Sequence, residues 1–235
     1  MNKATKEPIC SECNLNFKTI FSGLPKNELD IITKEKTCGY YKKSSIIYQE
    51  NSRIKGFYCV NSGILKVYKT GIEGKEQIIR FAKKGDVIGY RSVLSGELAC
   101  TSAKVIEDAT LCYITSETLN YLLKNNSTFS IDLLQLVCAE LREANSFITD
   151  IAQKSVRERL AEVLLILKET FEVDNNKTLQ ISLTREELAN IVGTATESVI
   201  RLLSEFKNEK LISFEGKRIK LIDIERLTKL ANVFD

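Results

Sequence analysis

The sequence predicts an α+β protein with a β-rich N-terminal part, one long helix, and a C-terminal part of short helices closed by a β-hairpin. Three observations predict this order. Short apolar runs separated by turn residues fill residues 40–114. The apolar period then lengthens from two residues to about 3.6 after residue 126, and a glycine at position 193 separates two short amphipathic segments. A chain of 235 residues is long enough for two packed cores.

The composition excludes several classes of protein. Histidine, the commonest general base and metal ligand, is absent, so we expect no enzyme. The sequence has no apolar run of about 18 residues and no signal-peptide core, which predicts a soluble cytoplasmic protein with no membrane partner. The net charge is only +3, and residues 154–235 carry equal numbers of acidic and basic side chains, so bulk charge gives no argument for DNA binding.

Four runs in the N-terminal part predict β-strands, at residues 46–48, 57–60, 64–68 and 77–81. The segments between several of these runs contain glycine and are typical of turns, at residues 61–63, 71–74 and 84–86. We therefore expect a β-barrel or β-roll.

A long helix follows residue 126, because neither glycine nor proline occurs again until Gly193. Its apolar or small residues recur in steps of three and four, as in a coiled-coil seam of roughly three heptads. They are Leu134, Val137, Leu141, Ala144, Ile148, Ile151 and Ser155. A second copy of the chain would cover this stripe, so we predict a parallel homodimer. The alternative is that the stripe packs on the chain's own β-roll. The apolar set shifts beyond Ile151, which predicts a new helix and a boundary near Gln153.

Two short helices around Gly193 predict a helix-turn-helix. Thr184 and Glu187 have the spacing of a capping box that starts the first helix at Arg185. Ala189 leaves room for the helices to cross closely, and Val199 would fill the angle between them. The alternative is an ordinary pair of antiparallel helices.

Polar side chains gather at the start of the second helix, the part that enters the major groove in this motif. Arg201 can donate two hydrogen bonds to guanine, and Glu197 can accept one from cytosine. Phosphate contacts are expected from hydroxyls and helix N–H groups. The predicted DNA-binding set here is Thr184, Thr194, Thr196, Glu197, Ser198 and Arg201. A surface ion pair between Glu197 and Arg201 is an alternative for those two residues.

A β-hairpin around Gly216 follows the second helix and predicts a wing. Lys217 and Arg218 at its tip are placed for DNA phosphates, although a solvated charged turn has the same sequence pattern. We therefore divide the chain into a sensing domain in residues 1–126, a dimerisation helix in 127–153, and a winged helix-turn-helix domain in 154–235.

Two segments make the chain resemble the Crp/Fnr family of transcription regulators over nearly its whole length. They are LTREELANIVGTATESVIR at residues 183–201 and GDVIG at residues 85–89. Its GYRSVLSGE at 89–97 and AQKSVRERL at 152–160 are similar to the Bacteroidetes branch of that family. The resemblance implies a cyclic-nucleotide-binding-like β-roll, a homodimer on palindromic double-stranded DNA, Glu197 and Arg201 as base readers, and RNA polymerase as a further partner.

The chain departs from the members of that family that bind cyclic nucleotides. Their Gly-Glu and Arg-Ser pairs match Gly89-Tyr90 and Ala99-Cys100 here, so two charge-assisted contacts are lost and cyclic AMP is not expected as the effector. Arg91 and Ser92 are candidates for a different anion, against a structural or surface role. The candidate effector residues are Gly89, Tyr90, Arg91, Ser92, Cys100 and Thr101.

Oxygen-sensing members of the family hold an iron-sulfur cluster with three N-terminal cysteines and one in the roll. Cys10, Cys13 and Cys112 match three of these positions, whereas Thr19 stands near the fourth. Four thiolates are usual for a cluster, so Cys38 or an external ligand would have to complete it. The alternative interpretations of these cysteines are a zinc site, a redox switch and ordinary structural cysteines.

Three functions are consistent with the sequence. The first is a transcription regulator controlled by an unidentified small-molecule or redox signal in the roll. The second is a cyclic-nucleotide-binding-like module that acts on a protein partner through its C-terminal helices. The third is the same regulator with Cys10, Cys13 and Cys112 as an oxygen or nitric oxide sensor.

Overall fold

The computed structural model describes residues 8–13 and 19–232. The chain forms two compact units, Met1–Leu141 and Arg142–Asp235. Helix α5 (Ser127–Gln153) runs through the boundary between them. The division into three segments, with a separate dimerisation helix, stays a proposal.

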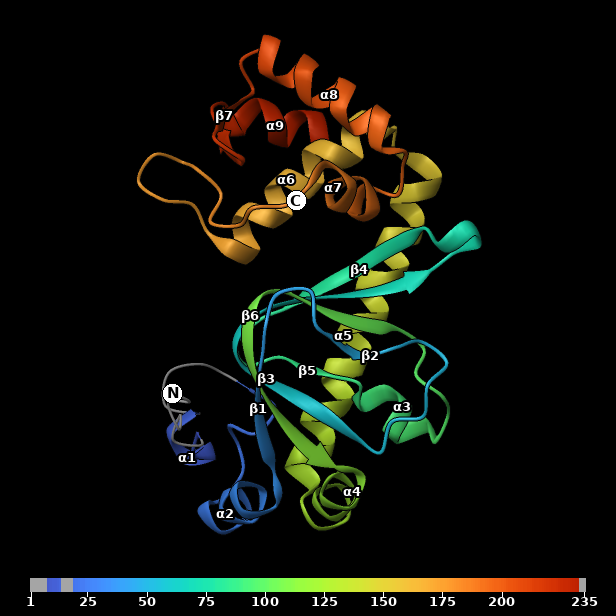
Figure 1. Ribbon diagram of the computed structural model, residues 1–235, viewed down its shortest axis with the longest axis vertical. Helices are drawn as coiled ribbons and strands as arrows, with labels where there is room; N and C mark the ends of the chain where they lie inside the picture. Colours follow the sequence, from blue (N-terminus) through green and yellow to red (C-terminus); the bar gives the residue numbers. More distant parts are fainter. Residues whose placement is uncertain (1–7, 14–18, 233–235) are drawn as a thin grey trace. The chain divides into compact units, whose positions relative to one another are not determined.

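The first unit is a β-roll built from antiparallel strands (Figure 1). The main path of the sheet runs β1 (Thr37–Tyr41), β6 (Ser102–Thr115), β3 (Gly56–Thr70) and β4 (Glu76–Ala82). Strand β2 (Ile46–Tyr48) also pairs with β6, and β5 (Val87–Ile88) pairs with β3. The predicted strands at 46–48 and 77–81 are therefore present.

The predicted turn at residues 61–63 was wrong, because β3 runs through it as one long strand. Gly63 has a φ of +86°, and the pairing of β3 with β6 shifts register on either side of it. A Cβ atom at this position would lie 2.4 Å from the carbonyl oxygen of Asp108. The glycine therefore serves a β-bulge, which bends the strand without ending it.

Short helices pack around the roll. They are α1 (Cys10–Cys13), α2 (Lys26–Glu35), α3 (Tyr90–Ser95) and α4 (Ser116–Asn125). A 3₁₀ turn at Ile72–Gly74, between β3 and β4, buries no residue. Helices α2 and α4 are in contact, and both touch the sheet. One apolar core joins these helices to the start of α5 through Phe21, Phe57 and Phe129, and a second fills the roll around Leu65 and Leu111.

The predicted seam on α5 is largely solvent-exposed. Leu134, Leu141 and Ile148 are 63%, 59% and 65% exposed, whereas Val137 packs partly on the first core of the roll. The alternative, that the stripe packs on the chain's own β-roll, therefore holds only for the beginning of α5. Ser155 was wrongly placed in the seam, since α5 ends at Gln153 and Ser155 caps the next helix.

The second unit packs its elements around one core. They are α6 (Val156–Phe171), α7 (Arg185–Val192), α8 (Thr196–Asn208), the hairpin β7 (Ile212–Glu215) and β8 (Arg218–Leu221), and α9 (Ile224–Ala231). Leu160, Leu188, Val199, Phe206 and Leu227 are completely buried. Within the described residues, no helix has the length and apolar character needed to cross a membrane.

Candidate nucleic-acid interface and effector site

Helices α7 and α8 form the predicted helix-turn-helix. The Thr184 hydroxyl accepts a hydrogen bond from the Glu187 backbone N–H at 3.0 Å, and the Glu187 carboxylate accepts one from the Thr184 N–H at 2.8 Å. This capping box starts α7 at Arg185, as predicted. Gly193 ends the helix in the left-handed conformation, with a φ of 71°.

Small and apolar side chains set the angle between the two helices. Ala189, Val192 and Val199 are each at most 1% exposed, so the two helices pack against each other through side chains that are shielded from water. Arg159 of α6 donates to the carbonyl oxygen of Val192 at 3.0 Å and to that of Gly193 at 3.5 Å. This arginine was not predicted as a functional residue, because nothing in its local sequence marks it. It fixes the turn by binding carbonyl groups at the end of α7.

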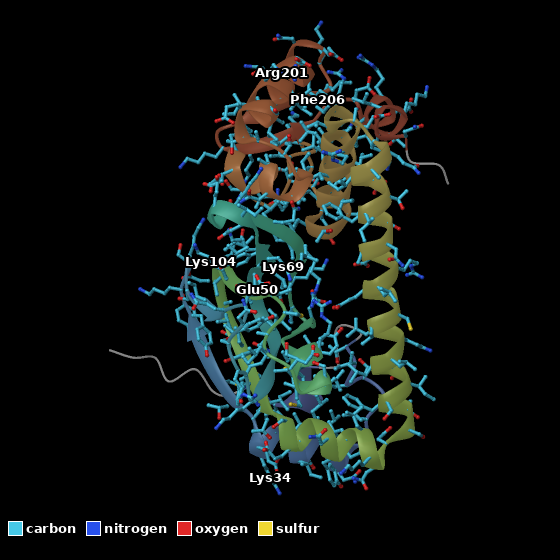
Figure 2. The ribbon with its side chains drawn as sticks, turned by 90° about the vertical axis from the view of Figure 1, so that its right-hand side faces the viewer. Lys34, Glu50, Lys69, Lys104, Arg201 and Phe206 are labelled. Atoms are coloured by element: carbon cyan, nitrogen blue, oxygen red, sulfur yellow. The ribbon has the colours of Figure 1, made fainter. Side chains whose placement is uncertain are left out.

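The start of α8 presents the predicted base-reading residues. Glu197 is exposed, and Thr194, Thr196 and Ser198 are partly exposed. The Arg201 side chain is 67% exposed, whereas Phe206 on the opposite face is completely buried (Figure 2). Thr194 precedes the helix, because Ala195 is its N-cap residue.

Arg201 forms an ion pair, but with Glu205 at 2.6 Å rather than with Glu197. The alternative pairing of Glu197 with Arg201 was therefore wrong, and the Glu197 carboxylate stays available at the exposed end of α8. Glu205 also accepts from Arg157 at 3.1 Å, and Arg157 binds Glu209 at 2.7 Å. Glu205 on α8 and Glu209 at its C-cap therefore tie this helix to α6.

The hairpin of β7 and β8 is the predicted wing, with Glu215 opposite Arg218 at its end. Lys217 and Arg218 are both exposed at the tip. Phe214 anchors the hairpin to the helices, since the Arg185 guanidinium lies 4.7 Å from its ring centroid. The wing cations therefore lie on a supported hairpin.

The candidate effector residues divide into buried and exposed ones. Gly89 starts α3 in the left-handed conformation, and Tyr90 is 1% exposed. Ser92 and Thr101 are buried, whereas Cys100 is exposed. Burial raises the pKa of the Tyr90 hydroxyl, and the charge of Glu140 raises it further. Ala99, at the position of the phosphate-binding arginine, is buried in the core of the roll.

Arg91 forms an ion pair with Glu140 of α5, at 3.5 Å between its Nε atom and the carboxylate. Arg80 of β4 binds the other oxygen of that carboxylate at 3.2 Å. Neither Arg80 nor Glu140 was singled out from the sequence, because their pairing joins elements about 60 residues apart.

Cys10, Cys13 and Cys112 line one small cavity, together with Thr19, Cys59 and Lys36. Cys112 lies between Cys38 and Cys59 in the register of three neighbouring strands. The Lys36 ammonium reaches into this group and lies 3.3 Å from the Cys10 sulfur. Burial raises the pKa of the thiols of Cys13, Cys59 and Cys112, that of Cys59 to about 12.

The same cysteines do not form a metal centre as they are placed. Among residues 8–13 and 19–232, no three His, Cys, Asp or Glu side chains are gathered so that they could hold a metal ion. Binding of an iron-sulfur cluster or a zinc ion there would require these side chains to move closer together.

Comparisons with known proteins match both units. Residues 39–126 match the model of the cyclic nucleotide-binding domain, and residues 158–230 match that of the Crp-like helix-turn-helix domain. The chain belongs to the Crp/Fnr family. Crp/Fnr proteins are DNA-binding transcription regulators and not enzymes, so the predicted class of function is confirmed.

Relatives in the Crp/Fnr family cover nearly the whole chain. The fumarate and nitrate reduction regulatory protein of Escherichia coli K12 is 26% identical over 228 residues, which is 94% of this chain and 90% of that protein. The structure of FixK2 from Bradyrhizobium japonicum superposes with a TM-score of 0.76 at 25% identity and covers 85% of this chain and 99% of that one. A Crp/Fnr regulator from Eubacterium rectale has a TM-score of 0.75 at 22% identity, covering 93% and 100%.

Proposed function

We propose that this Crp/Fnr regulator is a cytoplasmic homodimer that binds palindromic DNA and contacts RNA polymerase when it is bound there. The exposed stripe of α5 supports the dimer. Leu134, Leu141, Ile148 and Ile151 are apolar side chains that are 41–65% exposed on one helix. A row of this kind is costly to leave in water and matches the spacing of a coiled-coil seam.

The observation that supports specific DNA binding best is the exposed N-terminal half of α8 on a buried, capped scaffold. In this arrangement Glu197 and Arg201 read bases, and the hydroxyls of Thr184, Thr194, Thr196 and Ser198 bind phosphates or base edges. Lys217 and Arg218 of the wing bind phosphates.

The ion pair of Arg201 with Glu205 does not oppose this role. An exposed pair at this helical spacing contributes about 0.3–0.5 kcal/mol. Two hydrogen bonds from an arginine to guanine contribute about 1–3 kcal/mol of discrimination. Arg201 therefore gains by leaving Glu205 for a base, and Glu205 keeps its contact with Arg157.

The substitution Arg201→Ala tests the proposal. We expect the affinity for the preferred operator to fall by about 1–3 kcal/mol, which is roughly 5- to 160-fold, and the preference at one base position to relax. Fluorescence anisotropy with operator variants measures both effects. Lys229→Ala is the control, because Lys229 is exposed on α9 away from the helix-turn-helix.

Unchanged affinity and specificity in Arg201→Ala would favour the rival function, in which the C-terminal helices dock on a protein partner.

Cyclic AMP is not proposed as the effector. Tyr90 and Ala99 stand at the positions of the ribose-binding carboxylate and the phosphate-binding arginine, and both are buried. We propose instead that the β-roll responds to another small molecule or to a redox change.

For the cysteines we propose a structural role. Cys112 is buried in the sheet, and Cys10 and Cys59 pack partly against the apolar core that contains Phe57. Burial raises the pKa of the Cys59 and Cys112 thiols, so these two stay protonated and behave as small apolar side chains. A metal or redox sensor at Cys10, Cys13 and Cys112 is the alternative, and it would need these side chains to move closer together.

A further inference from the structure

Three charged residues that are distant in sequence meet beside α3. The Glu140 carboxylate of α5 binds Arg80 of β4 with one oxygen and Arg91 of α3 with the other, at 3.2 and 3.5 Å. Arg80 is itself fixed, because it also donates to the Val87 carbonyl oxygen at 2.8 Å. All of these residues belong to the first compact unit, so the contact is internal to it.

The contact is largely shielded from water. The side chain of Glu140 is 12% exposed and that of Arg80 is 22% exposed, whereas Arg91 is 40% exposed. A carboxylate so placed is stable only if its charge is balanced, and two guanidinium groups supply that balance. Asp86 is a further charged group near Arg80 and Glu140, and the charge of Lys83 acts on it as well.

A further polar group points to the same place. The Tyr90 hydroxyl is buried and makes no hydrogen bond of good geometry among the described residues, although the Glu140 carboxylate lies near enough to act on it as an acceptor. Glu140 is the nearby charge that acts on this hydroxyl. An unsatisfied buried hydroxyl is costly, so its position beside a carboxylate is informative.

We propose that Arg80, Arg91 and the Tyr90 hydroxyl form an anion-binding site of the roll, and that its ligand is the chain's own Glu140 carboxylate. The two guanidinium groups are therefore neutralised without a diffusible anion. It also ties α5 to the roll at the residue next to Leu141, a member of the exposed seam. This inference goes beyond the proposed function and does not depend on DNA binding.

Chemical rescue tests the site. Removing the carboxylate in Glu140→Ala leaves a vacancy of the size of acetate between two guanidinium groups. In a buffer without carboxylates, we expect the thermal unfolding midpoint to fall by roughly 5 °C. Added acetate should restore most of this loss in Glu140→Ala and none in the double variant Arg80→Ala/Glu140→Ala.

Two further samples complete the experiment. Glu143→Ala is the matched control, since Glu143 is exposed on the same helix, and its midpoint should change little and ignore acetate. Glu140→Gln keeps the shape of the side chain and tests the charge alone if Glu140→Ala does not fold. An unchanged midpoint in Glu140→Gln, or equal acetate effects in the Glu140→Ala and Glu143→Ala variants, would overturn the proposal. Stabilisation of the unsubstituted protein by acetate or inorganic phosphate would overturn it as well, because the site would then be open to diffusible anions.

Discussion

At the scale of single residues, the cysteines differ sharply in their surroundings. Cys100 and Cys138 are exposed, whereas Cys112 is buried and burial raises the pKa of Cys59 to about 12. Only the thiolate form reacts with alkylating agents or binds metals. With a pKa of about 12, roughly one Cys59 side chain in 10,000 is a thiolate at pH 8.

We therefore expect iodoacetamide at pH 8 to label the exposed Cys100 in the folded protein and to spare Cys59 and Cys112. The labelling of Cys59 should increase as the pH rises toward 12, because the raised pKa keeps the thiol protonated below it. Mass spectrometry of the labelled protein measures this, and denatured protein labelled at every cysteine is the control. Iron or zinc in anaerobically purified protein, or labelling of Cys59 as fast as that of Cys100, would instead support the metal or redox sensor.

At the scale of secondary-structure elements, the dimer proposal depends on the exposed apolar stripe of α5. Ile148 lies at the middle of its exposed C-terminal part and is 65% exposed. A charge at this position would be buried without a partner in a coiled-coil seam, next to the same charge of the second copy.

The substitution Ile148→Asp should therefore shift the protein from dimer to monomer at micromolar concentration without unfolding it. Sedimentation velocity gives the mass, and circular dichroism checks the fold. Ile72→Asp is the matched control, because Ile72 is 91% exposed and lies outside α5. A dimer that persists unchanged in Ile148→Asp would show that the stripe is not the interface.

The elements that the sequence predicted best are those with local signals. The capping box of Thr184 and Glu187, the glycine turn at Gly193 and the spacing of apolar residues along the helices each depend on residues a few positions apart. The bulge at Gly63 was misread, because Asn-Ser-Gly has the composition of a hairpin turn and only the neighbouring strand decides between the two. The pair of Arg80 with Glu140 depends on tertiary packing. Arg201 has a glutamate four residues away on either side, so helical spacing alone does not decide that it pairs with Glu205 rather than Glu197.

At the scale of the whole molecule, one chain combines a β-roll and a winged helix-turn-helix through the continuous helix α5. The match to Crp/Fnr proteins covers both units, although identity to the relatives compared is only 22–26%. A shared fold does not by itself fix the signal that a protein binds, so the signal has to be argued from the residues of this chain's own roll. Buried Tyr90 and the internal Glu140 ion pairs are features of this chain's own roll.

The central claim is that two identical subunits place residues 194–201 into successive major grooves of one duplex. Selection from a random duplex pool at moderate salt, followed by sequencing of the bound DNA, tests it most directly. We expect an inverted repeat whose half-site centres lie about 10–10.5 base pairs apart, bound by one dimer. Enrichment of a single half-site bound by a monomer, or no enrichment above the starting pool, would contradict the account.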